Sequence, residues 1–437
     1  MSYTLSDFLR AEVRPALGCT EPVAVALAAA AATEQLPVRP PERIRVKVDG
    51  NVFKNGLAVL IPGTDGQRGL DLAAGMGAVA GDAGRFMQVL EGMRRDQVEQ
   101  AAALVQAGQV AVELLPDTRG LFIQADVVAG GETARAVIQG AHDCIVSLHR
   151  NDQPITESPL LNTGKAHQGG HDVRQVEQWL KGQPLAALLA LADQATETEL
   201  ALVRQGVEMN HHLADYGLTH VCGLGVGRAL EDMAQNGVLQ RDMSLAAKIL
   251  TAAAADARMA GVGLPAMSSA GSGNNGLTAI LPIWAAGAFV DCPEATLLKA
   301  IALSHLVTAY IKTYTGRLSA VCSCSLAAGA GSAAGLAFAL GTGAPGVTRA
   351  INNLIEDLGG VLCDGAKTGC ALKLATAAGA AVQAALLAQR GVGAVAVEGI
   401  LGASPEQSVA HLGRICGEGM EQTGSTILGI MMEKTGC

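Results

Sequence analysis

The sequence predicts an α+β fold, with a large, mainly α-helical domain and a smaller inserted α+β module. Strand signals are confined to residues 42–150, whereas nearly every segment after residue 176 has the length and composition of a helix. The chain of 437 residues is 49% hydrophobic but only 3% aromatic, and it contains 54 glycines. We therefore expect a core built from closely approaching small-residue helices rather than from aromatic clusters.

The N-terminal segment, residues 1–41, is expected to form helices that pack on the helical domain. Thr4 or Ser6 could cap a first helix, and Pro22 suits the first turn of a second one. Three prolines between residues 37 and 41 should end this helical stretch, because proline disrupts a helix interior.

Residues 42–150 are expected to form the α+β module. The segment 44–48 alternates in polarity with period two, which predicts a half-buried strand, and residues 69–95 are predicted to be helical. The pair Gly130-Gly131 predicts a tight hairpin turn between two later strands. Those later strands are predicted at 110–114, 121–128, 133–138 and 144–148.

Residues 151–175 are polar and rich in proline and glycine, which predicts a linker. Residues 176–437 are expected to form the helical domain, in which Ser404 ahead of Pro405 is typical of a helix start. The predicted helices are 176–180, 185–192, 197–214, 244–259, 294–314, 327–340, 350–358, 372–390, 395–402 and 404–420.

Composition narrows the expected partners and location. The net charge is −9 and no long basic run occurs, so we expect no nucleic-acid partner. The first ten residues lack the apolar stretch of a signal peptide, which favours a cytoplasmic location where disulfides rarely persist. Residues 318–348 carry no charge but are weakly hydrophobic and lack a flanking aromatic belt, so we expect a buried helix and no membrane span.

The chain contains ten cysteines, and none of them forms a C-x-x-C pair, which argues against a zinc ribbon or a thioredoxin-type motif. Cys322, Cys363 and Cys370 lie in glycine- and alanine-rich surroundings, and Cys19 stands alone near the start. This pattern favours an iron–sulfur site with separate ligands and a remote reactive thiol.

Cys363 and Cys370 would be about 10 Å apart along the axis of a continuous helix, too far for one compact site. Gly365 and Gly369 instead predict a loop that brings the two thiols together, ahead of a helix that begins near residue 371. The N–H groups of that helix would favour anionic sulfur. The alternative is that both cysteines pack as small apolar residues.

Cys322 and Cys324 form a C-x-C pair, in which one thiol is expected to be a metal ligand and the other to pack. Three cluster thiolates would leave one iron open to hold substrate as a Lewis acid, whereas four would suit electron transfer.

Cys19 precedes the helix start at Pro22, so the helix dipole is expected to lower the pKa of its thiol, with Glu21 working against this effect. The alternative is a free buried cysteine.

The polar, glycine-rich run at 268–276 could bind a carboxylate through backbone N–H groups and an amino acid's polar head through asparagine side chains. Alternatives are a plain turn, or the substrate loop of a pyridoxal-phosphate dehydratase, which needs a strand-rich α/β fold that the sequence does not predict. The candidate substrate-binding residues of this run are Ser269, Gly273, Asn274 and Asn275.

Further candidate substrate contacts lie close to the cysteines. His305 and Lys312 are seven residues apart and share a helix face, and Arg317 follows shortly before Cys322. Each could contact substrate or belong to a solvated or satisfied polar stripe. Lys367 and Lys373 crowd the segment of the last two cysteines and complete the candidate set.

Four segments together resemble the L-cysteine desulfidase family, which is related to the α-chain of iron–sulfur L-serine dehydratases. The segments are ALGCTEP at 16–22, SAGSGN at 269–274, GRLSAVC at 316–322 and CDGAKTGCALK at 363–373. The resemblance extends, in order, over essentially the whole chain.

This resemblance implies a pyridoxal-independent β-elimination that converts L-cysteine and water to pyruvate, ammonia and sulfide on a [4Fe–4S] cluster. It implies cluster ligands at Cys322, Cys363 and Cys370 and the catalytic cysteine at Cys19. Ser323-Cys324 departs from the family pattern, which leaves Cys324 as a second candidate beside Cys322.

In related serine dehydratases a C-terminal cysteine can occupy the open iron, which makes Cys437 a candidate ligand, with a disordered tail thiol as the alternative. Packing roles are expected for Cys144, Cys222, Cys292 and Cys416. We expect an amino-acid substrate and a homo-oligomer. Rival functions are L-serine deamination by the same cluster chemistry and a non-enzymatic, thiol-rich metal-binding protein.

Overall fold

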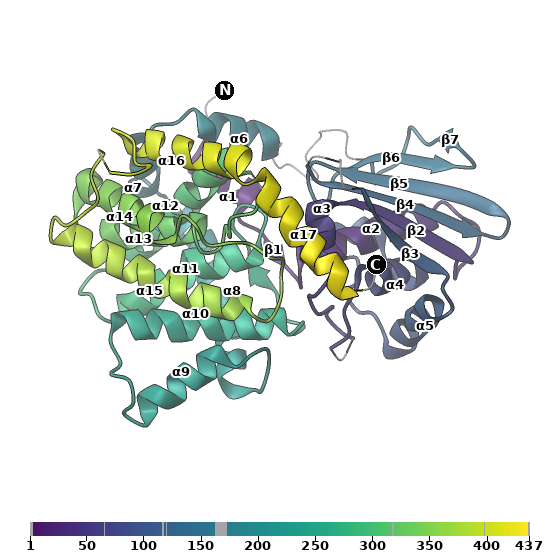
Figure 1. Cartoon of the computed structure of the whole chain (residues 1–437), viewed down its shortest axis with the longest axis horizontal. Helices are drawn as coiled ribbons and strands as arrows, with labels where there is room; N and C mark the ends of the chain where they lie inside the picture. Colours follow the sequence, from purple (N-terminus) through teal and green to yellow (C-terminus); the bar gives the residue numbers. More distant parts are fainter. Residues whose placement is uncertain are drawn as a thin grey trace.

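The computed structural model describes residues 3–64, 66–115, 118, 120–161, 173–316, 319–396 and 398–435. Helices form one part of the described protein, and a six-stranded sheet with its covering helices forms the other (Figure 1). The predicted α+β, mainly helical fold class is therefore confirmed.

The six-stranded sheet has the strand order β3-β2-β4-β5-β6-β7. Strand β2 pairs in parallel with β3, and every other pairing is antiparallel. Gly130 and Gly131 both have positive φ and connect β4 to β5, so the predicted hairpin turn is confirmed. The strands are β2 (Arg43–Asp49), β3 (Val110–Leu115), β4 (Phe122–Ala129), β5 (Glu132–Gln139), β6 (Ile145–Arg150) and β7 (Gln153–Pro154).

Two helices of small residues, α2 (Thr20–Thr33) and α4 (Leu70–Ala80), pack on each other, and α2 also contacts β4 and β5 of the sheet. Every residue of α2 from Glu21 to Thr33 is buried. A Cβ atom on Gly77 of α4 would lie 2.1 Å from the carbonyl oxygen of Ala26, so the two backbones approach as closely as glycine allows. The expected packing through small residues is observed here.

The first 41 residues do not all pack on the helical part, contrary to expectation. Helix α1 (Leu5–Glu12), capped by Thr4, does so through Phe8 and Leu9. Helix α2 instead belongs to the core of the sheet. The physical reason is that α1 has only one apolar side, so a single surface can bury it. Helix α2 is apolar on all sides and needs partners all round, which the sheet and α4 provide.

The predicted helix 69–95 is interrupted. After α4 the backbone of Gly81 is extended, a 3-10 turn follows at Ala83–Gln88, and α5 (Arg95–Gln106) begins where that helix was expected to end. The predicted helix 395–402 is absent from the described residues of that segment. Gly399 there has a φ of +55°, and the amides of Glu398 and Leu401 make turn bonds to the carbonyls three residues before them instead of helical bonds to the fourth.

The predicted linker at 151–175 includes residues 162–172, which lie outside the described residues. Of the remainder, β7 extends the sheet and Leu160 is buried in the core of the sheet. Helix α6 begins at Val173, within the predicted linker.

The helical part packs its helices around α12, which contacts α13, α11, α7, α16, α6 and α8. A Cβ atom on Gly331 or Gly335 of α13 would lie 2.4 Å from a backbone oxygen of α12. The helices are α6 (Val173–Lys181), α7 (Leu185–Asp193), α8 (Glu197–Thr219), α9 (Val226–Gln235), α10 (Met243–Met259), α11 (Gly273–Gly287), α12 (Glu294–Thr315), α13 (Ala327–Ala339), α14 (Gly343–Leu358), α15 (Cys370–Gln389) and α16 (Pro405–Arg414).

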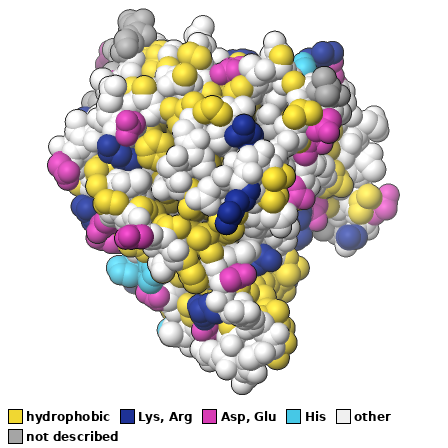
Figure 2. Space-filling view, turned by 90° about the vertical axis from the view of Figure 1, so that its left-hand side faces the viewer, with side chains coloured by type: hydrophobic (Ala, Val, Ile, Leu, Met, Phe, Trp, Pro, Cys, Tyr) yellow, Lys and Arg dark blue, Asp and Glu magenta, His cyan; other side chains and the backbone are white. Residues whose placement is uncertain are grey.

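By length and composition, one helix among the described residues, α15, is apolar enough to cross a membrane. Here it packs against α10, α13 and α14, and 61% of its most apolar stretch is buried. Helix α13, within the uncharged segment 318–348, is buried in the helical core as expected. Apolar side chains also reach the surface shown in Figure 2, where they gather between scattered charges. Near the end of α15, Leu386 and Leu387 are exposed.

The helical part and the sheet part are joined by α17 (Glu421–Thr435), drawn in yellow across the middle of Figure 1. It leaves the helical part through a π-helical turn at Ile415–Gly419 and packs on α3 (Gly50–Gly56), where Leu428 lies against Gly50. Helix α3 starts from the buried Asp49, whose carboxylate accepts from the N–H groups of Asn51 and Val52.

The close approach of α4 to α2 predicts a sharp cost for Gly77→Ala. The added methyl group must displace backbone of Ala26, so we expect a loss of about 1–3 kcal/mol in the free energy of unfolding, measured by urea denaturation. The control is Gly429→Ala, at an exposed position of α17 with open space around it, where about 0.5–1 kcal/mol of stabilisation is expected. Equal stability of the two variants would contradict the close packing.

Candidate functional site

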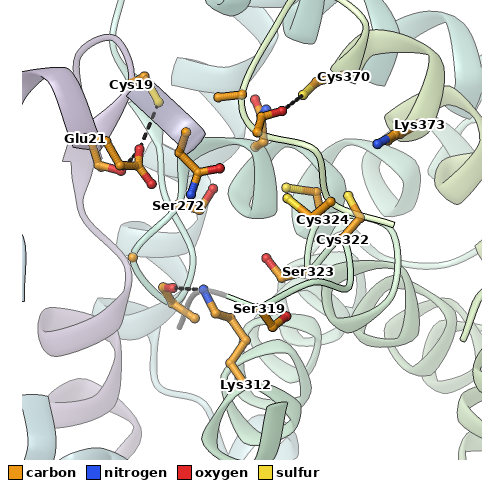
Figure 3. Close-up of a pocket in the computed structure, with 18 of the residues that line it drawn as sticks. Cys19, Glu21, Ser272, Lys312, Ser319, Cys322, Ser323, Cys324, Cys370 and Lys373 are labelled. Atoms are coloured by element: carbon orange, nitrogen blue, oxygen red, sulfur yellow. Dashed lines mark hydrogen bonds between the residues drawn. The ribbon is translucent and has the colours of Figure 1, made fainter. Parts of the chain in front are cut away.

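A cavity of about 90 Å³ lies between the sheet part and the helical part. Five cysteines from three distant stretches of sequence line it: Cys19, Cys322, Cys324, Cys363 and Cys370. Figure 3 shows Cys19 and Glu21 on one side of this cavity and Cys322, Cys324 and Cys370 on the other. The structure thus brings together every cysteine proposed from the sequence for catalysis or metal binding, except Cys437, which lies outside the described residues.

The position of Cys19 is set by a short backbone pairing. Strand β1 (Pro15–Ala16) pairs antiparallel with β8 (Ala266–Met267), which precedes the polar loop at 268–274. The amide of Ala270 donates to the carbonyl of Glu12, at 3.0 Å, and extends this connection. Gly18 has a φ of +67°, and a Cβ atom there would lie 2.6 Å from Cγ of Pro62, so glycine is required for the turn into α2.

Cys19 is the N-cap residue of α2, is 5% exposed, and donates its S–H to Oε2 of Glu21 at 3.0 Å. Thr20 donates to the same oxygen, also at 3.0 Å, and Nε2 of His142 lies 3.8 Å from Oε1. Burial acts to raise the pKa of Glu21, but His142 and these two donors outweigh burial and hold the pKa at about 2. Glu21 is therefore a carboxylate at neutral pH.

The pKa of Cys19 differs from the expectation. Burial, and then the charge of Glu21, raise the pKa of this thiol well above its usual range, although the Arg258 guanidinium acts to lower it. The helix dipole was expected to lower this pKa, but a dipole effect cannot offset the removal of the thiol from water beside a carboxylate. In the free protein Cys19 is a thiol at neutral pH.

Cys322 and Cys363 are held on adjacent extended segments. Val321 pairs with Leu362, the Cys322 amide donates to the Val361 carbonyl at 2.8 Å, and the Cys363 amide donates to Ala320 at 2.7 Å. The connection between these two segments is 38 residues long and includes α13 and α14. The pairing explains how cysteines far apart in sequence share one wall of the cavity.

Cys370 is the first residue of α15, and the loop before it returns the chain toward Cys363, as the glycines predict. Gly365 has a φ of +89°, and a Cβ atom there would lie 2.3 Å from the carbonyl oxygen of Lys54 in α3. The loop is thus docked on the sheet part through a glycine that no other residue can replace without displacing backbone.

The four thiols of this wall differ electrostatically. Hydrogen bonds from the Cys324 thiol, and from the Ser325 hydroxyl at 3.4 Å, lower the pKa of Cys322 despite its burial. The same bond to Cys322, followed by burial, raises the pKa of Cys324. Burial raises the pKa of Cys363 and raises that of Cys370 to about 11. Cys322 is therefore the thiol that becomes an anion most readily.

Lysines supply positive charge to the same wall. Nζ of Lys373 donates to the Leu362 carbonyl at 2.7 Å and to Asp364 at 2.6 Å, and Lys367 also pairs with Asp364. Burial acts to raise the pKa of Asp364, but the two lysines outweigh it and hold the pKa at about 2. Lys54 reaches the wall from α3 and donates to the Ser319 carbonyl at 3.4 Å.

The donor set suits a multi-atom sulfur-bound group better than one ion. Among the described residues no group of three or more His, Cys, Asp and Glu side chains converges closely enough to hold a single metal ion. The thiols instead surround a shared space, with Lys54 and Lys373 close enough to act on the pKa of Cys363. Thiolates spaced around a cavity and neutralised by lysines could hold an iron–sulfur cluster.

The candidate substrate-binding residues divide into two groups. Asn274, Lys312 and Lys373 line the cavity, and Nζ of Lys312 donates to the Ala270 carbonyl at 2.8 Å. The others that the structure describes lie outside the lining, namely Ser269, Gly273, Asn275, His305 and Lys367. Arg317 lies outside the described residues.

His305, Ser269 and Asn275 lie behind the cavity wall and hold it in shape. Nδ1 of His305 lies 2.8 Å from the Ser269 hydroxyl, and burial lowers the pKa of this histidine to about 3. Asn275 donates to the Ser269 carbonyl at 3.2 Å and accepts from the Ser323 hydroxyl at 2.9 Å. This network ties the polar loop to the C-x-C segment.

The sequence did not predict Arg258, His142 or Lys54 as site residues, yet Arg258 and His142 line the cavity and Lys54 donates to Ser319 of its lining. Arg258 had a detectable signal, because it and Asp256 are charged residues that directly follow the alanines 252–255, in the buried end of α10. His142 and Lys54 lie on the sheet part and carried no local signal.

The amino-acid sequence matches the family described as serine dehydratase alpha chain over residues 84–429. A UPF0597 protein from Desulfatibacillum aliphaticivorans is 50% identical over 435 residues, which cover 99% of each chain. UPF0597 proteins from Geobacter sulfurreducens and Clostridioides difficile are 41% and 39% identical, with 97% or more of each chain covered. The family match includes Cys322, Cys363 and Cys370, whereas Cys19 precedes it and lies within the span shared with the first relative.

The docking of Gly365 on Lys54 predicts that Gly365→Ala weakens both the fold and the cysteine wall. We expect a loss of about 1–3 kcal/mol from the strained φ alone, together with less iron bound per chain after anaerobic reconstitution. Thermal unfolding and iron analysis are the measurements. The matched control is Gly360→Ala in the same segment, where open space surrounds the position; iron loss in both variants alike would contradict the docking role.

Proposed function

This chain belongs to the serine dehydratase alpha-chain family, and we propose that it is an iron–sulfur-dependent L-cysteine desulfidase. The family is known for iron–sulfur serine dehydratases, which makes the chain a lyase-type enzyme. The proposed reaction consumes L-cysteine and one water and yields pyruvate, ammonium and hydrogen sulfide. The observation that carries the proposal is the single cavity that has a thiol–carboxylate pair on one side and a wall of thiols on the other.

We assign the cluster ligands to Cys322, Cys363 and Cys370, with a [4Fe–4S] cluster as the group they hold. Cys322 is favoured over Cys324 because its sulfur accepts from the Ser325 hydroxyl at 3.4 Å and its amide pairs with Val361, on the segment that carries Cys363. When bound, the cluster would supply a Lewis acid that stabilises negative charge on the leaving sulfur.

The protein's own residues would handle the proton at Cα. Cys19 is assigned as the base that removes it, which requires that its thiol proton has first been lost. Before that loss, the Cys19 thiol donates its S–H to the ionised Glu21, which orients the sulfur, and His142 stabilises the Glu21 carboxylate; the thiol proton is released to solvent. The Cα–H electrons then form the Cα–Cβ double bond as sulfide leaves Cβ, and the aminoacrylate is hydrolysed to pyruvate and ammonium.

The lysines in the cavity and beside it support a mechanism without pyridoxal phosphate. A Schiff base needs a lysine whose amine is neutral and free to attack. Lys54, Lys312 and Lys373 each donate from Nζ to a backbone carbonyl, and Lys373 also pairs with Asp364. Eight of the described cysteines are free thiols, which suits a reducing compartment, and we propose a cytoplasmic location. They are Cys19, Cys222, Cys292, Cys322, Cys324, Cys363, Cys370 and Cys416.

The proposal is tested by anaerobic reconstitution with iron and sulfide, followed by assays of pyruvate and sulfide with L-cysteine or L-serine. Sulfide and pyruvate from L-cysteine are expected. Pyruvate from L-serine alone would select the dehydratase activity for which the family is known. A bound cluster with neither activity would select a metal-binding protein without catalysis.

Cys19→Ser is expected to lower turnover by about 10²-fold or more, because serine is a far weaker base, while the cluster's absorption spectrum is retained. Cys363→Ala is expected to lose the spectrum itself, since it removes a ligand. Cys292→Ser, a cysteine outside the cavity lining, serves as the control. Retained turnover in the Cys19 variant would remove this residue from the mechanism.

The pH dependence of kcat/KM follows from the raised pKa of Cys19. Activity that requires its thiolate should rise with pH into the alkaline range. Glu21→Gln removes the neighbouring negative charge, so the pKa of Cys19 falls and the alkaline limb shifts to lower pH. The control is Thr20→Val, which removes a hydrogen-bond donor to Glu21 but keeps the negative charge of Glu21. It should leave the alkaline limb in place. A limb that does not move in Glu21→Gln would contradict the coupling of Cys19 to Glu21.

A further inference from the structure

We propose that Arg258 and the first turn of α11 form the subsite that binds the α-carboxylate of the substrate. The inference rests on the proposed function in so far as that function takes an α-amino acid. It goes further by assigning one end of the ligand to a residue that neither the cysteine pattern nor the family match identifies.

Arg258 lies in the last turn of α10, is 4% exposed and lines the cavity. Nη1 donates to Oδ1 of Asn274 at 2.9 Å, and Nη2 donates to the Gly18 carbonyl at 2.6 Å. Both acceptors are neutral, and the buried Nε has no hydrogen-bond partner among the described residues. A guanidinium offers more donors than these two bonds use, so capacity for a further acceptor remains.

No described residue supplies a carboxylate that forms an ion pair with Arg258. A buried charge without a counter-charge is costly, and an anionic ligand in the cavity would offset that cost. A planar carboxylate is the partner that guanidinium binds best, because two N–H donors can meet its two oxygens.

The start of α11 adds a second set of donors at the same place. Helix α11 begins at Gly273, and the N-cap residue Ser272 makes no side-chain capping bond. The first N–H groups of a helix have no acceptor within the helix and favour negative charge. A Cβ atom on Gly273 would lie 2.4 Å from Nε of Arg258, so the guanidinium occupies space that any side chain there would take.

The position of Arg258 also orients the rest of an amino acid. The guanidinium contacts the Gly18 carbonyl, one residue from Cys19, so a carboxylate held there leaves Cα near the Cys19 sulfur. The ionised Glu21 on the same side is suited to face the ammonium group. The sulfur of the ligand is then directed across the cavity toward the thiol wall shown in Figure 3.

The test compares two ligands that differ in the carboxylate, 3-mercaptopropionate and ethanethiol, by calorimetric titration of the anaerobically reconstituted protein. The wild-type protein should prefer 3-mercaptopropionate. In Arg258→Gln this preference should fall by about 10- to 100-fold, the range expected for loss of a charged hydrogen bond. Arg258→Lys should keep part of it, since the charge remains. The control, Arg204→Gln, changes an exposed arginine paired with Glu294 and should keep all of it.

Thermal unfolding of each variant checks that it folds. If Arg258→Gln does not fold, the ligand preference of Arg258→Lys tests the subsite instead. An unchanged preference in a folded Arg258 variant, or no preference in the wild-type protein, would overturn the subsite. Binding is measured without turnover, so the two proposals fail separately. A preference that depends on Arg258 in a protein that releases no sulfide would keep the subsite and reject the lyase; sulfide release with a preference independent of Arg258 would do the reverse.

Discussion

The cavity depends on the pairing of β1 with β8, two residues against two, because this pairing holds the chain ahead of Cys19 to the helical part. Cys19 itself begins α2, which belongs to the core of the sheet. Two further hydrogen bonds hold the chain just before α2: the polar loop after β8 donates to Glu12, and Arg258 donates to Gly18. The site therefore lies at the interface between the two cores and belongs to neither of them. A second contact across this interface is the close approach of Gly365 to the Lys54 carbonyl.

The two sides of the interface are electrostatically unlike, and this difference gives the site its direction. On one side burial, and then the negative charge of Glu21, raise the pKa of Cys19 and keep it protonated. On the other side, donors from Cys324 and Ser325 favour the anionic form of Cys322. Two cysteines of one cavity thus have opposite tendencies: burial beside a carboxylate keeps Cys19 protonated, whereas donated hydrogen bonds offset the burial of Cys322.

The sequence predicted what short-range patterns can encode. Alternating residues and the Gly130-Gly131 turn identified the sheet, and the glycines around Cys363 and Cys370 predicted the loop that joins them. Which core receives α2 was not predictable, because a helix that is apolar on all sides carries no direction. The pKa of Cys19 and the place of Arg258 were also beyond reach, since Gly18 and Arg258 meet across 240 residues of sequence.

The helical core is built from α1 and from helices that follow the sheet in the sequence, which sets an order for folding on the ribosome. The buried side chains of the sheet core lie between Val23 and Leu160, so that core can assemble while the later helices are still being made. Helix α1 emerges earlier, yet its partners are α6 and α8. Phe8 and Leu9 therefore have no core to enter during most of this period, and the apolar side of α1 is the surface of the nascent chain that a chaperone would need to shield.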